Sequence, residues 1–425
     1  MLTTLSFPYG RTTLNCRLEA DELKAVLTSS LEDYQAALSE EDLVRKALEN
    51  PIGCPRLAQL SAGKKNITVI TSDHTRPMPS RITIPLLLSE IRKGSPEACI
   101  SILVATGTRR AATREELLER FGDEIVSQEN IYIHNCDDAS SMTILGGTPG
   151  GNTIAINRLA AEADLRIAEG FIEPHFFAGF SGGRKSIMPG IASRGSIMYN
   201  HCAPWIADPH SVMGSLEHNP IHEDMVFAAR KSGLAFILNV VLNHKKEIIG
   251  AYAGDMEEAH REGVAFLSSL CACPASPADI VIVSNGGFPL DQNIYQSVKG
   301  MATAARTCRK GGVIIIVSQC ADGHGGESFY HTFSSEPDTK KIMDSILSQD
   351  PKATIPDQWQ SQILCSILLN HPVILVSDVP KEMAKKMHLL PASSIEEAVQ
   401  QAKSILKLPS PSITAVMDGP SIIIQ

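Results

Sequence analysis

The stretch NITVITSDHTRPMPS, residues 66–80, decides the fold class, because an apolar strand runs directly into a polar loop that contains two prolines. The β-branched run Asn66–Ser72 is typical of a strand buried on both faces. Arg81–Lys93, after the loop, has the pattern of a helix. The same order follows at once, with a strand at Cys99–Thr106 and a helix near Arg114–Ser127. This alternation predicts an α/β fold with a largely parallel sheet covered on both faces.

The alternation of strands and helices continues and then restarts beyond residue 275. In the first half we expect a helix near 154–162, strands at 165–170 and 234–243, and a helix over 255–270. Residues 273–279 have the Pro and Ser content of a linker, and three apolar strands separated by helices follow. A chain of 425 residues exceeds what one hydrophobic core usually serves.

We therefore predict two α/β domains with largely parallel sheets and an active site in the cleft between them. The predicted domains are residues 1–274, which bind the cofactor, and residues 275–409. Within the first, the strands on either side of the Pro-Tyr-Gly-Arg turn at 8–11 form a hairpin. A last strand pair lies near the C-terminus, and the sequence leaves open whether residues 410–425 return to the first domain.

Composition narrows the class of protein. The net charge of −9 argues against general nucleic-acid binding, which needs a basic face, but not against a local pocket for a small anion. The ten cysteines are scattered without a C-x-x-C pair, which favours reduced thiols over a zinc ribbon. The N-terminus lacks a secretory pattern, and no apolar run is as long as a membrane span. We expect a cytoplasmic protein that binds neither nucleic acid nor membrane.

Four conspicuous loops come directly after predicted strands. They are TSDHTRPMPS (71–80), TGTRR (106–110), EGFIEPHFF (169–177) and SNGGFPLDQ (284–292). Ligands of open parallel sheets bind outside the carboxyl ends of the strands. The four loops are therefore expected to converge on one cleft. In the first of them, Arg76 is suited to clamp a carboxylate or phosphate, although a loop stapled by Asp73 is the plainer interpretation.

The loop around residue 185 combines backbone freedom with positive charge. Gly182 and Gly183 allow the backbone to approach a ligand closely, and Arg184 and Lys185 follow them. Backbone N–H groups and cations together suit a phosphate. The amine of Lys185 is alternatively a point of covalent attachment. A glycine turn carrying two solvated cations is the interpretation without a ligand.

Two further candidates lie elsewhere in the chain. His201, in MYNHCAP, offers an imidazole, which suits nickel, copper or zinc when it is neutral. Tyr295 and Lys299 stand four residues apart on a predicted helix, with Gln296 beside them, so they can face the first domain together. A lone structural histidine and a solvated helix face are the alternatives.

Taken together, these motifs carry a resemblance to a known family. SDHTRPMPS, EPHFFAGFSGGRKSIMPGI, MYNH and NGGFPLDQNIYQSVKG resemble, in this order and over essentially the whole chain, the nickel-dependent lactate racemase family. The resemblance implies two α/β domains around a cleft. It also implies a nickel-pincer nucleotide, the Ni-bound pyridinium-3,5-bisthiocarboxylic acid mononucleotide, made by separate cofactor-maturation enzymes. One arm of the cofactor is then joined covalently to Lys185, and His201 is the protein's nickel ligand.

The resemblance further assigns roles within the cleft. The cofactor takes the hydrogen at C2 of a small 2-hydroxy acid as hydride, while a base takes the hydroxyl proton and a planar 2-keto acid forms. The implied positions are the acid/base His175, the substrate-orienting Arg76, Gln296 and Lys299, the cleft-lining Tyr295 and Trp359, and the cofactor-binding Asp73, Thr75, Gly182, Gly183 and Arg184.

One position departs from the family pattern. The family has a second acid/base histidine in a G-T-H-R loop, where this chain has Arg109. A guanidinium stays protonated and is a poor base. We therefore expect a racemase or epimerase of a 2-hydroxy acid other than simple lactate, such as a dicarboxylate or sugar acid, with Arg109 binding its second anionic or polar group. The alternatives are a one-base hydride-transfer enzyme and a non-catalytic cofactor-binding protein.

Overall fold

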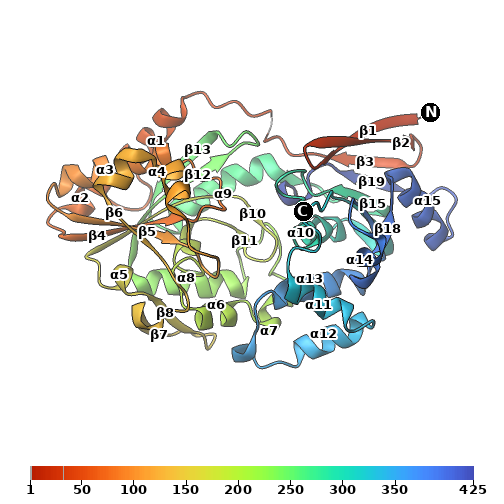
Figure 1. Ribbon diagram of the computed structural model, residues 1–425. Helices are drawn as coiled ribbons and strands as arrows, with labels where there is room; N and C mark the ends of the chain where they lie inside the picture. The colour runs from red at the N-terminus through yellow and green to blue at the C-terminus, as the bar shows by residue number, and fades with distance from the viewer. Residues whose placement is uncertain (1, 32) are drawn as a thin grey trace.

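The computed structural model describes residues 2–31 and 33–425, which form two lobes, each built on a six-stranded sheet (Figure 1). The first sheet has the order β13-β12-β9-β4-β5-β6. Its strands are parallel except β13, which pairs antiparallel with β12. The strands are β4 (Asn66–Ser72), β5 (Cys99–Ala105), β6 (Asn130–Ile133), β9 (Leu165–Phe171), β12 (Leu234–Leu242) and β13 (Ile248–Gly254).

The second sheet is wholly parallel and has the order β18-β17-β16-β15-β19-β3. Its strands are β3 (Leu23–Leu27), β15 (Ala278–Ser284), β16 (Cys308–Val317), β17 (Val373–Val376), β18 (Leu390–Ala392) and β19 (Ile413–Val416). The predicted α/β class with largely parallel sheets is thereby confirmed.

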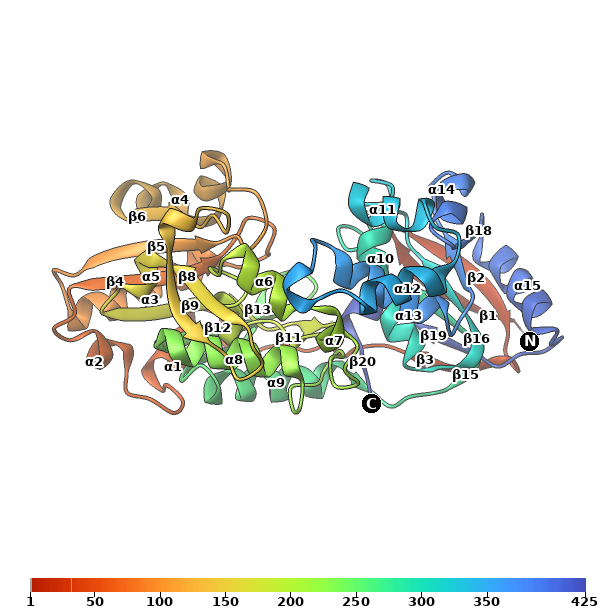
Figure 2. The same cartoon turned by 90° about the horizontal axis from the view of Figure 1, so that it is seen from below.

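The N-terminal residues belong with the second sheet, which corrects the predicted domain of residues 1–274. β3 pairs with β19, and the antiparallel hairpin of β1 (Leu2–Tyr9) and β2 (Thr12–Glu19) covers one face of that sheet. Figure 2 shows this hairpin in the lobe that contains α15, far from β4. The hairpin itself was predicted, but β3, which follows it, pairs with β19 about 390 residues further along the chain, beyond the reach of local patterns.

The last residues divide between the two lobes. β19 lies inside the second sheet, whereas β20 (Ile423–Ile424) pairs in parallel with β14 (Ala272–Cys273) at the junction. The two strands of the predicted C-terminal pair, β19 and β20, are both present, but they pair with other strands and not with each other. Ile423 packs with Ile172 and Phe180 of the first lobe, so only the final residues of 410–425 return to that lobe.

Helices cover both sheets. They are α1 (Glu40–Glu49), α2 (Leu57–Ser61), α3 (Ser80–Gly94), α4 (Arg114–Gln128), α5 (Arg158–Ala161), α6 (Arg194–Asn200), α7 (Ala203–Ile206), α8 (Pro220–Ser232), α9 (Glu258–Cys271), α10 (Ile294–Ala305), α11 (Glu327–Ser334), α12 (Thr339–Leu347), α13 (Gln358–Leu368), α14 (Lys381–Lys386) and α15 (Ile395–Leu406). Short 3₁₀ turns are η1 (Ala139–Ser141), η2 (Gly183–Ser186), η3 (Pro351–Ala353) and η4 (Gly419–Ser421). Within the described ranges, none of the helices is long and apolar enough to cross a bilayer.

Two small antiparallel hairpins complete the first lobe. They are β7 (Met142–Gly147) with β8 (Thr153–Asn157), and β10 (Pro174–His175) with β11 (Gly179–Phe180). The prediction of a helix over 154–162 is wrong for its first half, because these residues form β8, where Ile154 and Ile156 are fully buried. Only the second half is helical, as α5. The second hairpin turns the chain after β9 back toward η2, and this turn places residues 175–185 beside the carboxyl ends of the first sheet.

Candidate active site

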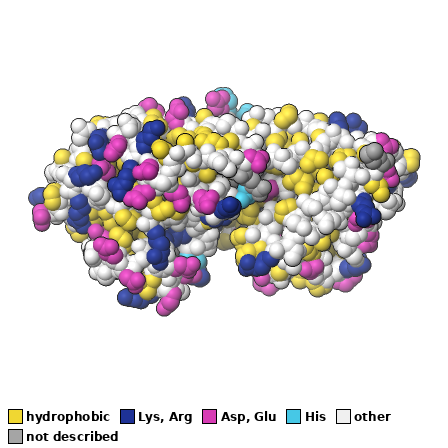
Figure 3. Space-filling view, turned by 90° about the horizontal axis from the view of Figure 1, so that it is seen from above, with side chains coloured by type: hydrophobic (Ala, Val, Ile, Leu, Met, Phe, Trp, Pro, Cys, Tyr) yellow, Lys and Arg dark blue, Asp and Glu magenta, His cyan; other side chains and the backbone are white. Residues whose placement is uncertain are grey.

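The strand-end loops of both lobes meet in one cavity of about 590 Å³. Figure 3 shows the surface hollowed between the two halves of the molecule. Residues from β4–α3, β5–α4, β9–η2, α10 and α13 line the cavity. The predicted site residues that line it are Asp73, Thr75, Arg76, Arg109, His175, Gly182, Lys185, His201, Tyr295, Gln296, Lys299 and Trp359. The cavity therefore brings together residues that are spread over almost 300 positions of the chain.

Two predicted cofactor-binding residues lie outside the cavity lining. The guanidinium of Arg184, 1% exposed, donates to the carbonyls of Ala178 (2.7 Å) and Gly182 (3.3 Å). The backbone N–H of Gly183 donates to Oδ1 of Asn239 at 2.7 Å. These contacts hold the N–H of Gly183 and the terminal nitrogens of Arg184 within the protein, whereas Nε of Arg184 is buried without a hydrogen-bond partner among the described residues. A cofactor-binding role for the two residues stays a prediction.

The Asp73–Arg76 segment forms a tight turn at the end of β4. The N–H of Thr75 donates to Oδ1 of Asp73 at 2.7 Å, and the N–H of Arg76 donates to the carbonyl of Asp73 at 3.1 Å. Burial opposes ionisation of the Asp73 carboxyl, but Arg109 and Thr75 outweigh it and lower the pKa of Asp73. Asp73 therefore acts as the staple of the loop, and Arg76 projects into the cavity with its Nη1 3.8 Å from Oε1 of Glu173.

Of the two adjacent arginines that follow β5, only Arg109 faces the cavity. Its Nη1 donates to Oδ2 of Asp73 at 2.9 Å, and its side chain remains 44% exposed. Arg110 turns outward and binds both carboxylate oxygens of Glu116 at 2.6 and 2.8 Å. The structure thus decides a point that the sequence left open, namely which guanidinium points inward.

His175 lies on the β10–β11 hairpin, packed between two aromatic rings. Its ring stacks on Phe176 with centroids 5.2 Å apart and meets Phe177 edge-on at 4.6 Å. The N–H of Ala178 donates to Nδ1 at 3.3 Å, which orients the ring and, while this contact is made, leaves the proton of the neutral ring on Nε2. Burial, together with the charges of Lys185 and Lys299, holds the pKa of His175 well below its usual range. The imidazole is therefore neutral near neutral pH, as a proton acceptor must be.

Lys185 presents its amine to the cavity from η2. Its Nζ lies 5.9 Å from the centre of the Phe177 ring, and among the described residues it has no hydrogen-bond or ion-pair partner. Burial holds the pKa of Lys185 well below 10.5, with the charges of Arg184 and Arg76 adding to the effect. A lysine amine that is desolvated among cations is more nucleophilic than an exposed one, because more of it is unprotonated.

His201 follows the last turn of α6 and is buried. Its ring contacts Phe177 and Trp359 edge-on, with centroids 5.0 and 4.8 Å away. Its Nδ1 is buried without a hydrogen-bond partner in the described part of the protein. Burial, with the charge of Lys185, lowers the pKa of His201 to about 3. The ring is therefore a neutral imidazole, the form that binds metals.

The residues present fit the cofactor that the resemblance implies. An unpartnered amine and an unpartnered imidazole line the same cavity. Over residues 2–31 and 33–425, no group of three or more His, Cys, Asp or Glu side chains forms a metal site. His201 can offer one ligand to a metal that is carried by a second molecule, such as a metal-bearing nucleotide.

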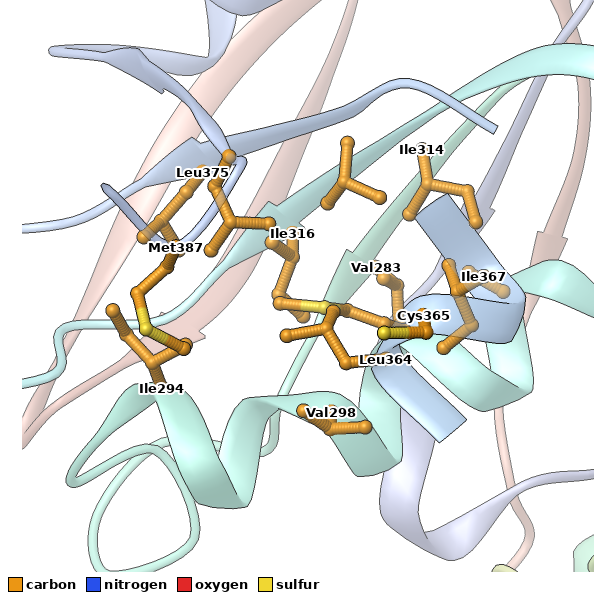
Figure 4. Packing of buried hydrophobic residues seen from close by; sticks show 14 of the residues in the cluster. Val283, Ile294, Val298, Ile314, Ile316, Leu364, Cys365, Ile367, Leu375 and Met387 are labelled. Atoms are coloured by element: carbon orange, nitrogen blue, oxygen red, sulfur yellow. The ribbon is translucent and has the colours of Figure 1, made fainter. Parts of the chain in front are cut away.

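The second lobe contributes the facing wall from two helices. On α10, the hydroxyl of Tyr295 donates to Asp357 at 2.8 Å, and Lys299 lines the cavity one turn further on. Burial lowers the pKa of Lys299 to about 8, and the charge of Arg76 contributes. Figure 4 shows Ile294 and Val298 on α10 pointing into the apolar core of this lobe. This packing fixes the helix whose other face meets the ligand.

The sequence did not single out several lining residues, among them Glu173 and Gln360. Glu173 lies within the quoted EPHFF motif, and its carboxylate faces Arg76. Gln360 follows Trp359, and its side-chain amide donates to the carbonyl of Tyr295. Both lie close in sequence to residues that were singled out, His175 and Trp359. This closeness was the sequence feature that could have pointed to them.

Comparison with known proteins gives matches over the whole chain. Residues 9–214 match the pattern of the lactate racemase N-terminal domain, and residues 273–424 match that of the lactate racemase C-terminal domain. Two proteins named lactate racemase, from Thermoanaerobacterium thermosaccharolyticum and Lactiplantibacillus plantarum, are 51% and 47% identical to it over 425 residues, 100% of each chain.

Solved structures agree with this match. The lactate racemase apoprotein from T. thermosaccharolyticum superposes with a TM-score of 0.96 at 50% identity and covers 100% of both chains. A Thermotoga maritima protein superposes with a TM-score of 0.62 over 92% of this chain and all of its own. At 18% identity, the second match supports the fold alone.

Proposed function

The chain belongs to the lactate racemase family, and on that premise we propose that it inverts the configuration of a 2-hydroxy acid at C2. It is therefore an isomerase of the racemase and epimerase type. The observation that carries the proposal is the meeting of Lys185, His201, His175 and Arg76 in one cavity between the lobes. These four side chains supply an attachment point, a metal ligand, a proton acceptor and an anion clamp.

We propose that the cofactor is the nickel-pincer nucleotide, attached at Lys185 and ligated by His201. When bound, this group supplies an acceptor for the hydrogen at C2, which leaves as hydride and returns to either face of the carbon. The amine of Lys185, whose pKa burial lowers well below 10.5, and the neutral imidazole of His201 support the assignment. Gly182 and Thr75 line the same cavity and can approach the nucleotide. Cofactor-maturation enzymes are then the partners that load the protein.

The protein's own residues bind the substrate and move its proton. Arg76 and Lys299 reach the cavity from opposite lobes, so together they can hold the substrate carboxylate with C2 between them. Neutral His175 accepts the proton of the C2 hydroxyl at Nε2 and gives it back; this step requires the tautomer with the ring's own proton on Nδ1, and so the loss of the 3.3 Å contact from the N–H of Ala178. Tyr295, Gln296 and Trp359 line the same space. The aromatic rings around His175 and His201 limit the access of water to the reacting atoms.

Lactate is the first substrate to consider, because both curated relatives are named lactate racemase. Arg109 favours a second candidate, a 2-hydroxy acid with a further anionic or polar group. Its guanidinium lies in the cavity, where the family pattern has a histidine, and it is close enough to Asp73 for an ion pair. For the second candidate, Arg109 must share its charge between Asp73 and the substrate.

Stereoisomer conversion tests the proposal. The protein is produced together with the maturation enzymes and given pure L- or D-lactate, malate or gluconate, and the configuration at C2 is followed by chiral chromatography. We expect the protein to convert at least one of these acids. Lactate or malate should be interconverted in both directions, and gluconate should be epimerised at C2. If lactate is converted poorly and malate well, Arg109→His should reverse the preference. A loaded protein that converts none of the three contradicts the proposal.

We also propose a cytoplasmic location. All ten cysteines are unpaired, and several lie in the interior, among them Cys16, Cys271 and Cys365. Reduced, buried thiols suit a compartment that keeps cysteines reduced. Fractionation of the producing cells, with the chain detected by antibody, tests the location. Recovery outside the cytoplasmic fraction contradicts it.

A further inference from the structure

Two guanidinium groups reach the cavity from two separate loops of the first lobe. Arg76 comes from the loop after β4, and Arg109 from the loop after β5. Neither loop has regular secondary structure around these residues. A side chain that must hold an anion loses precision if its loop moves. To keep the two guanidinium groups at a fixed separation, the loops that carry them must be held in place by contacts outside the cavity.

Arg120 on α4 supplies a direct contact to the first loop. Its Nη2 donates to the carbonyl of Asp73 at 2.5 Å and to the carbonyl of Arg76 at 2.6 Å. These two carbonyls are the two ends of the turn that carries Arg76. One nitrogen therefore holds both ends of the turn from behind, while the Arg76 side chain points into the cavity. Arg120 itself does not line the cavity.

The helix that carries Arg120 also follows the second loop. α4 begins five residues after Arg109, and the α4 segment before Gly122 ends where φ is 83° and ψ is 165°. The guanidinium of Arg81 donates to the carbonyls of Leu118 and Glu119, which lie in the last turn before this break. Arg120 thus lies at a helix end that Arg81 of α3 holds in place. Through its hydrogen bonds, Arg120 connects this end of α4 to the Asp73–Arg76 turn.

The choice of residue is informative. Arg120 is largely buried, burial lowers its pKa, and its other terminal nitrogen, Nη1, lacks a hydrogen-bond partner among the described residues. Within those residues its hydrogen bonds go to neutral carbonyls, while the carboxylates of Glu169, Asp73 and Glu119 act on its charge from a distance and only partly offset the effect of burial. A buried charge without a paired carboxylate costs stability. A planar guanidinium nevertheless reaches two carbonyls at fixed angles, which a flexible amine does less well.

We propose that Arg120 is a positioning residue for substrate binding: by holding the Asp73–Arg76 turn against α4, it sets the direction of the Arg76 guanidinium relative to Arg109. The proposal rests on the proposed function in one respect, the binding of the substrate carboxylate at Arg76. Arg120 does not touch the reacting atoms. Its loss should therefore weaken binding of the carboxylate more than it slows the chemical step.

The test compares Arg120→Gln and Arg120→Lys with Arg166→Gln. Arg166 is a matched control because it also donates to two backbone carbonyls of the first lobe, those of Ala160 (2.6 Å) and Ala161 (2.7 Å), outside the cavity. With loaded protein and the acid that the wild type converts, Arg120→Gln should raise KM about tenfold and change kcat less than about threefold. Arg120→Lys should recover part of the loss. Arg166→Gln should leave both constants within about twofold of the wild type.

Hydrogen exchange of the unloaded protein provides a second readout that does not depend on the substrate. In Arg120→Gln, the backbone amide of Arg76, which donates to the carbonyl of Asp73, should exchange about tenfold faster than in the wild type. Arg166→Gln should leave it unchanged. Unchanged exchange at Arg76 in Arg120→Gln, or equal losses in kcat and kcat/KM, overturns the inference. A wild type that converts no acid contradicts only the proposed function, and the exchange experiment still decides the role of Arg120.

Discussion

The two walls of the cavity are built differently. The wall from the first lobe consists mainly of strand-end loops, the β10–β11 hairpin and a 3₁₀ turn, and it presents Arg76, His175 and Lys185. The facing wall consists mainly of α10 and α13, whose apolar sides are packed into the core of the second lobe (Figure 4), and of the loop before α10. It presents Lys299 and Trp359. In Figure 3, charged side chains of both signs are also denser over the first lobe than over the second.

The difference indicates a division of labour. His175, Lys185 and His201 all belong to the first lobe, and burial lowers the pKa of each. The second lobe contributes Lys299, whose pKa burial also lowers, to about 8. Groups whose pKa is shifted by burial in a cleft are typical of reactive sites. The second lobe adds contacts on rigid helices. We infer that the first lobe carries the chemistry, and that the second mainly completes the binding of the substrate.

Among the substitutions that test this division between the two lobes, we expect the largest effect on activity at His175. His175→Gln removes the proposed proton acceptor and should lower kcat by about 10²- to 10⁴-fold, because general acid–base catalysis typically contributes that much. The measurement is kcat with loaded protein and a nickel content equal to that of the wild type. A Lys299→Met variant that loses as much kcat as His175→Gln would place the chemistry on both walls.

Arg76→Gln should have the next largest effect. Loss of a charge-assisted hydrogen bond to the substrate carboxylate should raise KM about tenfold to a hundredfold. Arg110→Gln is the matched control, since Arg110 is bound to Glu116 outside the cavity. Its KM should stay within about twofold of the wild type. Equal effects of the two variants would show that overall charge, and not the clamp, determines affinity.

The pH dependence of KM sharpens the role of the second lobe. The pKa of Lys299 is lowered to about 8, so its positive charge is present below pH 8 and is lost as the pH rises through that value. KM should therefore rise about tenfold between pH 7 and pH 9, one pH unit above the pKa. Lys299→Met should have a higher KM that varies less over this range. A wild-type KM that is constant from pH 7 to pH 9 would exclude a charge contribution from Lys299.

The smallest expected effect concerns Trp359. Its ring contacts that of His201 edge-on at 4.8 Å across the two lobes. Trp359→Phe keeps an aromatic ring, but the smaller ring reduces the contact with His201. Such aromatic pairs contribute about 0.5–1.5 kcal/mol. Activity of the loaded protein should fall by about twofold to tenfold, with no change in nickel content. Loss of nickel in this variant would show that the second lobe also holds the metal.

Local patterns were sufficient to predict the elements that carry the site. The loop after Asn66–Ser72, the glycine turn before Lys185 and the i, i+4 pair on α10 all follow from strand and helix periodicity, and all three line the cavity. The convergence of the loops also follows from one rule, since parallel strands place their carboxyl ends at the same edge.

The missed features depend on contacts between distant residues. The pairing of β3 with β19 joins the two ends of the chain, so the N-terminal boundary of the first domain could not be read from local sequence. Arg184 and Lys185 are adjacent and both basic, yet the positive φ of Gly183 and the carbonyl of Ala178 direct Arg184 into the core. Arg120 carries no motif at all. Its role depends on two carbonyls more than forty residues away.

The central claim, that the first lobe carries the reactive centre, is tested most directly at two lysines of the same cavity. Lys185→Ala and Lys299→Ala are each produced with the maturation enzymes, and intact mass and nickel content are measured beside the wild type. The wild type and Lys299→Ala should both show the cofactor's mass increment and one nickel per chain, and Lys185→Ala should lack the increment. A covalent increment that persists in Lys185→Ala, or that disappears in Lys299→Ala, would contradict the claim.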